Sequence, residues 1–160
     1  MAIIVEGLDA TGKSTLGKYL ADELGLALQE SEGPAKSFDE IHHRIERYSE
    51  MVDTLFVRHP CVSQSIYYRV QTSSIIIDEQ TLQRFYRCDH TFIYCEPNSA
   101  SVNDFMSDHQ LKAHDTPEFV DRLKNNYWML LDLYRKWALR HAHFIYRIGD
   151  SQERLLQWLS

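Results

Sequence analysis

The stretch of sequence that decides the fold is Gly7-Leu8-Asp9-Ala10-Thr11-Gly12-Lys13-Ser14. It matches the pattern G-x-x-x-x-G-K-[ST] at every fixed position. An apolar run over residues 2–6 precedes it and predicts a short strand. Leu16, Leu20 and Leu24 follow at four-residue spacing before Gly25, which predicts a helix that ends at this glycine. Strand, glycine loop and helix thus follow one another, and this context makes the pattern specific.

A loop of this kind suits the phosphates of a nucleotide. Its glycines let backbone N–H groups curl around a phosphate, and the N-terminus of the following helix adds about half a positive charge. Lys13 can reach the β- and γ-phosphates, and the Ser14 hydroxyl is placed to ligate Mg²⁺. We therefore predict ATP and Mg²⁺ as cofactors, with Lys13 catalytic and Ser14 as the metal ligand. The predicted cofactor-binding residues are Gly7, Asp9, Ala10, Thr11, Gly12, Lys13, Ser14 and Thr15.

Further apolar runs alternate with helical patterns along the chain. Strands are predicted at residues 26–28, 54–57, 91–95 and 144–148, and helices include 13–24, 38–48, 63–72 and 80–87. The longest helix is predicted to open at Thr116 and to bury a stripe of Val120, Leu123, Tyr127, Leu130, Tyr134 and Trp137. Apolar strands that alternate with helices indicate a parallel sheet with helices on both faces. Residues 1–160 are therefore predicted to form one α/β domain.

Composition narrows the classes of function. The chain of 160 residues has 17 Lys and Arg against 23 Asp and Glu, a net charge of −6, which disfavours binding to a nucleic-acid polymer. No apolar run has the roughly 18 residues of a membrane helix, and the start has no secretory pattern, so we expect a cytoplasmic protein without a membrane partner. The three cysteines lie in no C-x-x-C, which disfavours a disulfide framework or a zinc site.

The loop and its flanks carry a resemblance to a known family. Residues 6–15 closely resemble the first motif of thymidylate kinases and, more broadly, of nucleoside-monophosphate and deoxynucleoside kinases. Arg58-His59, followed by Ser63 and Tyr67, resembles the family's D-R-[YH]…S…A-Y-Q segment with one residue inserted. Residues 89–94 resemble its P-D-x-T-x-x-L strand. The Arg58-His59-Pro60 segment followed by Ser63-Gln64 is similar to that of small phage-encoded P-loop kinases.

The resemblance implies a P-loop NTPase fold with a five-stranded parallel sheet of order 2-3-1-4-5. It implies a short lid around residues 109–116, adenine near Gly149-Asp150, and an acceptor near Arg58, which would be catalytic. The acceptor would be a small nucleotide, specifically a nucleoside monophosphate, and a homodimer is left open. Its predicted binding residues are Asp9, Phe38, Arg44, Arg58, Gln64 and Tyr67.

The sequence allows a second interpretation for two of these residues, Asp9 and Arg44. Asp9 would contact the 3′-hydroxyl of the acceptor sugar, or it would satisfy backbone N–H groups of its own loop. Arg44 shares a predicted helix with Phe38, and a guanidinium beside aromatic rings suits a nucleobase and its phosphate. The alternative for Arg44 is a solvated helix face.

Departures from the family pattern keep two other functions open. Val57 replaces the family's aspartate, and residues 30–34 lack the arginine of its R-E-P-G motif, so a kinase of nucleosides or other small hydroxyl compounds is the first alternative. Arg58, Lys112 and Arg122 are the candidates for the cation that neutralises charge during transfer. Residues 75–79, IIIDE, have the form of a Walker B strand, which would indicate a non-kinase ATPase or a nucleotide-binding regulator; the competing interpretation is a polar helix start.

Overall fold

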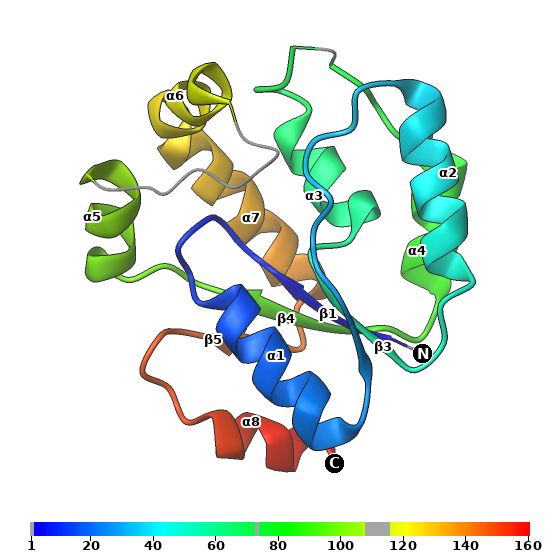
Figure 1. Ribbon diagram of the computed structural model, residues 1–160, viewed down its shortest axis with the longest axis vertical. Helices are drawn as coiled ribbons and strands as arrows, with labels where there is room; N and C mark the ends of the chain where they lie inside the picture. The colour runs from blue at the N-terminus through cyan, green and yellow to red at the C-terminus, as the bar shows by residue number, and fades with distance from the viewer. Residues whose placement is uncertain (1, 73, 108–115) are drawn as a thin grey trace.

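The computed structural model describes residues 2–72, 74–107 and 116–160. In this part of the chain, five parallel strands form one sheet (Figure 1). They are β1 (Ile3–Glu6), β2 (Ala27–Gln29), β3 (Thr54–Val57), β4 (Thr91–Cys95) and β5 (Phe144–Tyr146). Their order is β2-β3-β1-β4-β5, and each neighbouring pair is parallel. The predicted fold class and strand order are confirmed.

The helices cover both faces of this sheet. They are α1 (Lys13–Leu24), α2 (Phe38–Ser49), α3 (Pro60–Tyr67), α4 (Glu79–Arg87), α5 (Ser99–Ser107), α6 (Pro117–Asn125), α7 (Tyr127–His141) and α8 (Gln152–Leu159). Helices α1 and α8 lie on one face, below the sheet in Figure 1, and α3 and α7 lie on the other. Alternate residues of β1 supply the two cores: Ile3 and Val5 pack with Leu16 and Leu155, whereas Ile4 packs with Leu130.

Three predicted element boundaries are wrong. The helix predicted from Thr116 onward is two helices, because Asn126 leaves helical geometry (φ −110°) and its side-chain Nδ2 donates to the Arg122 carbonyl at 2.8 Å. Thr116 does cap α6, and the predicted stripe is buried. The helix predicted at 63–72 is α3, which starts earlier because Pro60 fits a first turn and which ends earlier, at Tyr67. The strand predicted at 144–148 ends at Tyr146, where the Arg147 N–H donates to Asp150 Oδ2 at 2.8 Å.

The Walker B interpretation of residues 75–79 is also wrong, because this segment forms no strand. Asp78 is the N-cap of α4 and accepts hydrogen bonds from the backbone N–H (2.9 Å) and the hydroxyl (2.7 Å) of Thr81. The polar helix start is therefore the correct alternative. Across the described residues, none of the helices has the length and apolar character needed to cross a membrane.

Candidate active site

The glycine loop leaves the end of β1 in a conformation that most side chains disfavour. Gly7 (φ 148°), Ala10 (φ 58°) and Gly12 (φ 79°) all have positive φ. A Cβ at position 7 would lie 2.5 Å from the backbone oxygen of Cys95 on β4. Gly7 is thus required both by its dihedral and by the close approach of the neighbouring strand. The loop is held at the carboxyl edge of the sheet, where ligands bind in open α/β folds.

The start of α1 fits the phosphates of a nucleotide. No side chain caps the helix, and no acidic residue lies in its first turn, so the positive end of the helix dipole is not neutralised there. The Lys13 amine lies within the loop, where it donates to the Leu8 carbonyl and to the Thr11 hydroxyl (3.3 Å). Ser14 and Thr15 are exposed beside it. A hydroxyl oxygen at this place suits Mg²⁺, which prefers oxygen ligands.

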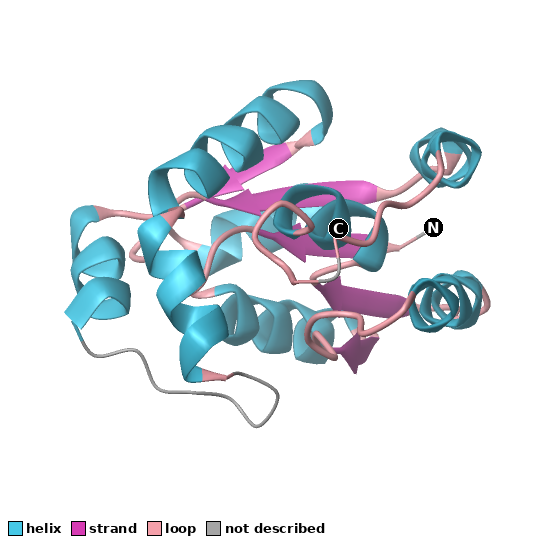
Figure 2. Ribbon diagram, turned by 90° about the horizontal axis from the view of Figure 1, so that it is seen from above, coloured by secondary structure: helices cyan, strands magenta, loops and turns pink. Residues whose placement is uncertain are grey.

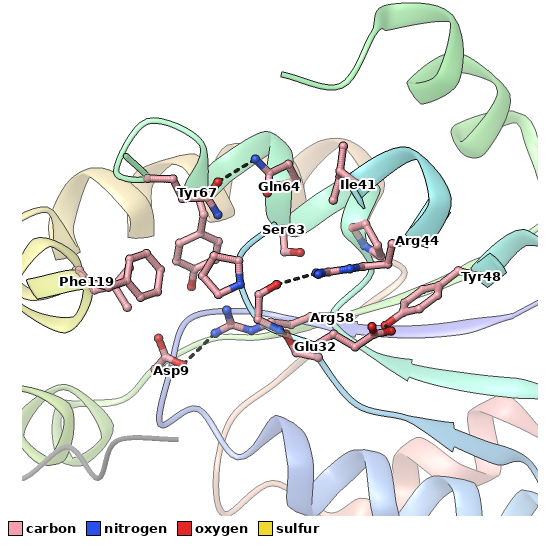
Figure 3. A pocket seen from close by; sticks show the side chains of 16 residues that line it. Asp9, Glu32, Ile41, Arg44, Tyr48, Arg58, Ser63, Gln64, Tyr67 and Phe119 are labelled. Carbon is pink, nitrogen blue, oxygen red and sulfur yellow. Dashed lines mark hydrogen bonds and ion pairs between the residues drawn. The ribbon is translucent and has the colours of Figure 1, made fainter. Parts of the chain in front are cut away.

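Beside the loop lies a pocket that we call the Arg58 pocket (Figure 3). It is formed by the loop, the segment after β2, α2, α3 and α6. Its lining residues are Asp9, Ser31, Glu32, Gly33, Pro34, Ile41, Arg44, Tyr48, Arg58, Pro60, Ser63, Gln64, Tyr67, Gln71, Phe119 and Leu123. Five of the six predicted acceptor-binding residues are thereby brought together. The sixth, Phe38, is absent from the lining; its side chain is 53% exposed and its ring lies 4.2 Å from that of His42.

Arg58 lies between the loop and this pocket. It directly follows β3 and has a left-handed backbone (φ 68°). Its Nη2 donates to Asp9 Oδ1 at 3.0 Å, and its guanidinium carbon lies 5.0 Å from the centre of the Tyr67 ring (Figure 3). The Arg58 side chain is 14% exposed. Asp9 therefore pairs with a largely buried guanidinium, which neither interpretation of Asp9 from the sequence anticipated.

Glu6 is one residue of this site whose role was not predicted from the sequence. Its side chain is fully buried, and Oε1 accepts from the His59 backbone N–H (2.6 Å) while Oε2 accepts from the Tyr134 hydroxyl (3.0 Å). Burial raises the pKa of Glu6 to about 7, against the lowering effect of the His59 hydrogen bond and the Arg58 charge. A carboxylate that ends an apolar strand was the available signal, since such a group needs buried donors.

Arg44 and Glu32 form the opposite side of the pocket. Arg44 is buried, and it donates to the Gly33 carbonyl (2.6 Å) and to Glu40 Oε1 (2.6 Å), so it is not on a solvated helix face. Glu32 accepts from the Tyr48 hydroxyl (2.9 Å) and from Arg47. Burial alone would raise the pKa of Glu32, but these two hydrogen bonds outweigh it and lower the pKa. Glu32 is therefore ionised.

The remaining wall offers amide and aromatic groups. Gln64 donates from Nε2 to Gln71 Oε1 and to the Ile75 carbonyl, both at 2.7 Å. Phe119 and Leu123 extend the lining from α6. Arg122, a candidate for the charge-neutralising cation, lies on the same helix with its guanidinium carbon 6.0 Å from the Phe119 ring centre. Lys112 and most of the predicted lid at 109–116 lie outside the described residues.

Comparisons with known proteins bear on the fold. No family model matches the sequence, and no curated protein matches it significantly. Solved structures do match. One is the YorR protein of Bacillus subtilis in complex with phosphorylated GDP, at 16% identity and a TM-score of 0.72, covering 99% of this chain and 93% of that one. Another is deoxyadenosine kinase from M. mycoides with bound dATP, at 12% identity and a TM-score of 0.56, covering 99% and 97%.

A shikimate kinase from Bacteroides thetaiotaomicron also matches, at 14% identity and a TM-score of 0.60, covering 99% of this chain and 96% of that one. These similarities extend over nearly the full length of each protein. In this chain the strand order is β2-β3-β1-β4-β5, and the glycine loop lies between β1 and α1. The chain therefore has the fold of P-loop kinases.

Proposed function

We propose that the protein transfers the γ-phosphoryl group of ATP to a (deoxy)nucleoside monophosphate held in the Arg58 pocket. The observation that carries this proposal is the largely buried Arg58 guanidinium between the loop aspartate and the Tyr67 ring. A guanidinium in this place can meet an acceptor phosphate or the transferred group through its planar fork. Arg44, on the far side of the pocket, offers a second guanidinium.

The chain's residues would act by positioning and by neutralising charge, because phosphoryl transfer needs little covalent help from a protein. Lys13 would contact the β- and γ-phosphates, in exchange for its bonds to Leu8 and Thr11. When bound at Ser14, Mg²⁺ would neutralise charge on the same phosphates. Asp9 would orient both Arg58 and a hydroxyl of the acceptor sugar. The Gln64 and Gln71 amides and the Phe119 ring are suited to a nucleobase.

A kinase of nucleosides or of another small hydroxyl compound is the second candidate, and the charges of the pocket favour it. Arg58 and Arg44 each already pair with a carboxylate, that of Asp9 and that of Glu40. Glu32 adds a further anion to the lining. A neutral acceptor would leave these pairs intact, whereas a phosphate has to share or displace a partner. Structures similar to this chain include a deoxyadenosine kinase and shikimate kinases.

The experiment that separates the two is labelled transfer from [γ-³²P]ATP with Mg²⁺ to each deoxynucleoside, each deoxynucleoside monophosphate and shikimate. A product that forms with one or more monophosphates and not with their nucleosides supports the first candidate. Product with nucleosides alone contradicts it and supports the second. A 5′-hydroxyl oligonucleotide belongs in the same panel, and we expect no label on it because the chain carries a net charge of −6.

A further inference from the structure

A second cavity lies behind the Arg58 pocket. It has a volume of about 630 Å³ and lies between α2 and α4, where β1 begins. Figures 1 and 2 place these two helices at the same end of the molecule. Nothing in the proposed transfer reaction uses this space. Its volume is within the usual range for small-molecule sites, about 300–1,000 Å³.

The walls of this cavity are aromatic with a few polar groups. Phe56 from β3 and Phe85 from α4 line it together with the ring of His59, which stacks on Phe85 at 4.4 Å. His42 and His90 also line it, and among the described residues His42 Nε2 and His90 Nδ1 are buried without a hydrogen-bond partner. Asp78 Oδ2 lies 3.9 Å from that His42 nitrogen, beyond hydrogen-bond distance. Buried nitrogens of this kind cost free energy until a ligand or water satisfies them.

The charges of the lining disfavour a strongly anionic ligand. Arg84 is the one Lys or Arg among the lining residues that the structure describes, and the carboxylates of Glu46 and Asp53 outweigh it. Burial lowers the pKa of His59 to about 3 and also lowers the pKa of His90, so both imidazoles are neutral at physiological pH. A neutral molecule therefore fits this cavity better than a nucleotide with its phosphates.

The cavity shares its wall with the proposed acceptor site. Tyr48 lines both cavities, and its hydroxyl holds Glu32 in the Arg58 pocket. Its ring lies 5.0 Å from that of Phe56 and 5.5 Å from that of His59. His59 follows Arg58 directly, and its backbone N–H bonds to Glu6. A molecule that moved the Tyr48 or His59 ring would thereby shift groups that contact the acceptor.

We propose that this cavity binds a small, neutral, planar heteroaromatic molecule of about purine size, and that its occupancy tunes the acceptor site through Tyr48 and His59. Ring faces suit stacking on the aromatic walls, and ring N–H or carbonyl groups would hydrogen-bond the His42 and His90 imidazoles once these rings turn their buried nitrogens toward the ligand. The binding claim is independent of the proposed function. The tuning claim rests on it.

Cys88 provides a reporter for occupancy. It lines the cavity and is exposed, whereas Cys61 and Cys95 are buried and burial raises the pKa of each thiol to about 12. Iodoacetamide at pH 7.5 should therefore alkylate Cys88 alone, as peptide mass spectrometry would show. With hypoxanthine or benzimidazole at about ten times its dissociation constant, we expect alkylation to slow about tenfold. Neither probe has a hydroxyl group that could accept a phosphoryl group.

Matched variants locate the bound probe. Ser49 lines the cavity from an exposed position on α2, and Glu50 is its exposed neighbour outside the lining. Ser49→Trp should abolish probe binding measured by calorimetry, whereas Glu50→Trp, which adds the same indole outside the cavity, should leave it unchanged. His90→Phe should weaken binding about tenfold, the loss expected for one good hydrogen bond. Absence of binding by both probes, or equal binding to Ser49→Trp and Glu50→Trp, would overturn the proposed site.

The tuning claim has its own readout. In the transfer assay, a saturating probe should change the KM for the acceptor at least threefold, which corresponds to about 0.7 kcal/mol. The KM for ATP should stay unchanged. The Ser49→Trp variant should lose this response. A probe that binds the cavity without altering the KM for the acceptor would overturn the coupling through Tyr48 and His59. Because the alkylation and calorimetry need neither ATP nor acceptor, failure of the proposed function would not affect them.

Discussion

The backbone N–H of His59 donates a 2.6 Å hydrogen bond to Oε1 of Glu6, so the residue that precedes the glycine loop also fixes the turn that follows β3. The Arg58 N–H donates a second hydrogen bond, to the Val5 carbonyl at 2.9 Å. Between these two bonds, Arg58 keeps its left-handed backbone and directs its guanidinium to Asp9. These two hydrogen bonds thus link the glycine loop to the Arg58 pocket.

Glu6 should make stability depend on pH. Its pKa is about 7 in the folded protein and near 4.5 in an unfolded chain, so the folded state binds more protons between these values. The free energy of unfolding should therefore fall as pH rises from about 4.5 to 7, by on the order of 3 kcal/mol from this group. Urea unfolding at pH 5 and pH 8 should show a smaller fall for Glu6→Gln than for the unchanged protein. An equal fall in both would contradict this; Glu118→Gln, an exposed change, is the control.

At position 58, a glycine variant should be more stable than an alanine variant. Both Arg58→Gly and Arg58→Ala remove the guanidinium, but only glycine adopts φ 68° without strain. We expect the glycine variant to be more stable by about 1 kcal/mol in urea unfolding. At Arg69, which is not among the positive-φ residues, alanine should be at least as stable as glycine. The same ranking at both sites would refute the strain at position 58.

Alanine at position 7 should destabilise the protein far more than alanine at position 25. Both have positive φ, but a Cβ at position 7 meets the Cys95 backbone oxygen at 2.5 Å, whereas nothing lies within 4 Å at position 25. Gly25→Ala should cost about 1–2 kcal/mol, the strain of the dihedral alone. Gly7→Ala should cost clearly more and should also impair ATP binding. Thermal unfolding and ATP titration of the two variants provide the comparison, and equal losses would count against the close approach.

The parallel sheet and the glycine loop could be predicted because they depend on local patterns and on one specific motif, whereas the strand order was predicted from the family resemblance. Arg58, Gln64 and Tyr67 were placed together by the resemblance of this segment to a family motif, and all three line the Arg58 pocket. Phe38 was predicted to join them but does not line the pocket, because the sequence predicts the helix and not the direction in which its first side chain points. The break at Asn126 depends on a side-chain hydrogen bond that competes with the helix. The second cavity could not be predicted at all, because it depends on how far apart α2 and α4 lie.

Lys13 should be required for transfer but not for folding. Lys13→Met keeps most of the side-chain volume inside the loop and removes the charge that would meet the β- and γ-phosphates. The rate of transfer should fall at least about 100-fold, while the far-ultraviolet circular dichroism stays unchanged. Lys18→Met, on the exposed side of the same helix, should retain normal activity. A loss of less than about threefold would remove the loop from the mechanism.

The most direct test of the central claim, that the acceptor binds beside Arg58 and the donor at the glycine loop, is a comparison of two constants in Arg58→Ala. We expect kcat/KM for the preferred acceptor to fall at least about 100-fold, because a largely buried guanidinium is lost from beside the transferred group or its acceptor. The dissociation constant for ATP, measured by calorimetry, should stay within about twofold of that of the unchanged protein. A normal kcat/KM for the acceptor, or a loss confined to ATP binding, would contradict the account.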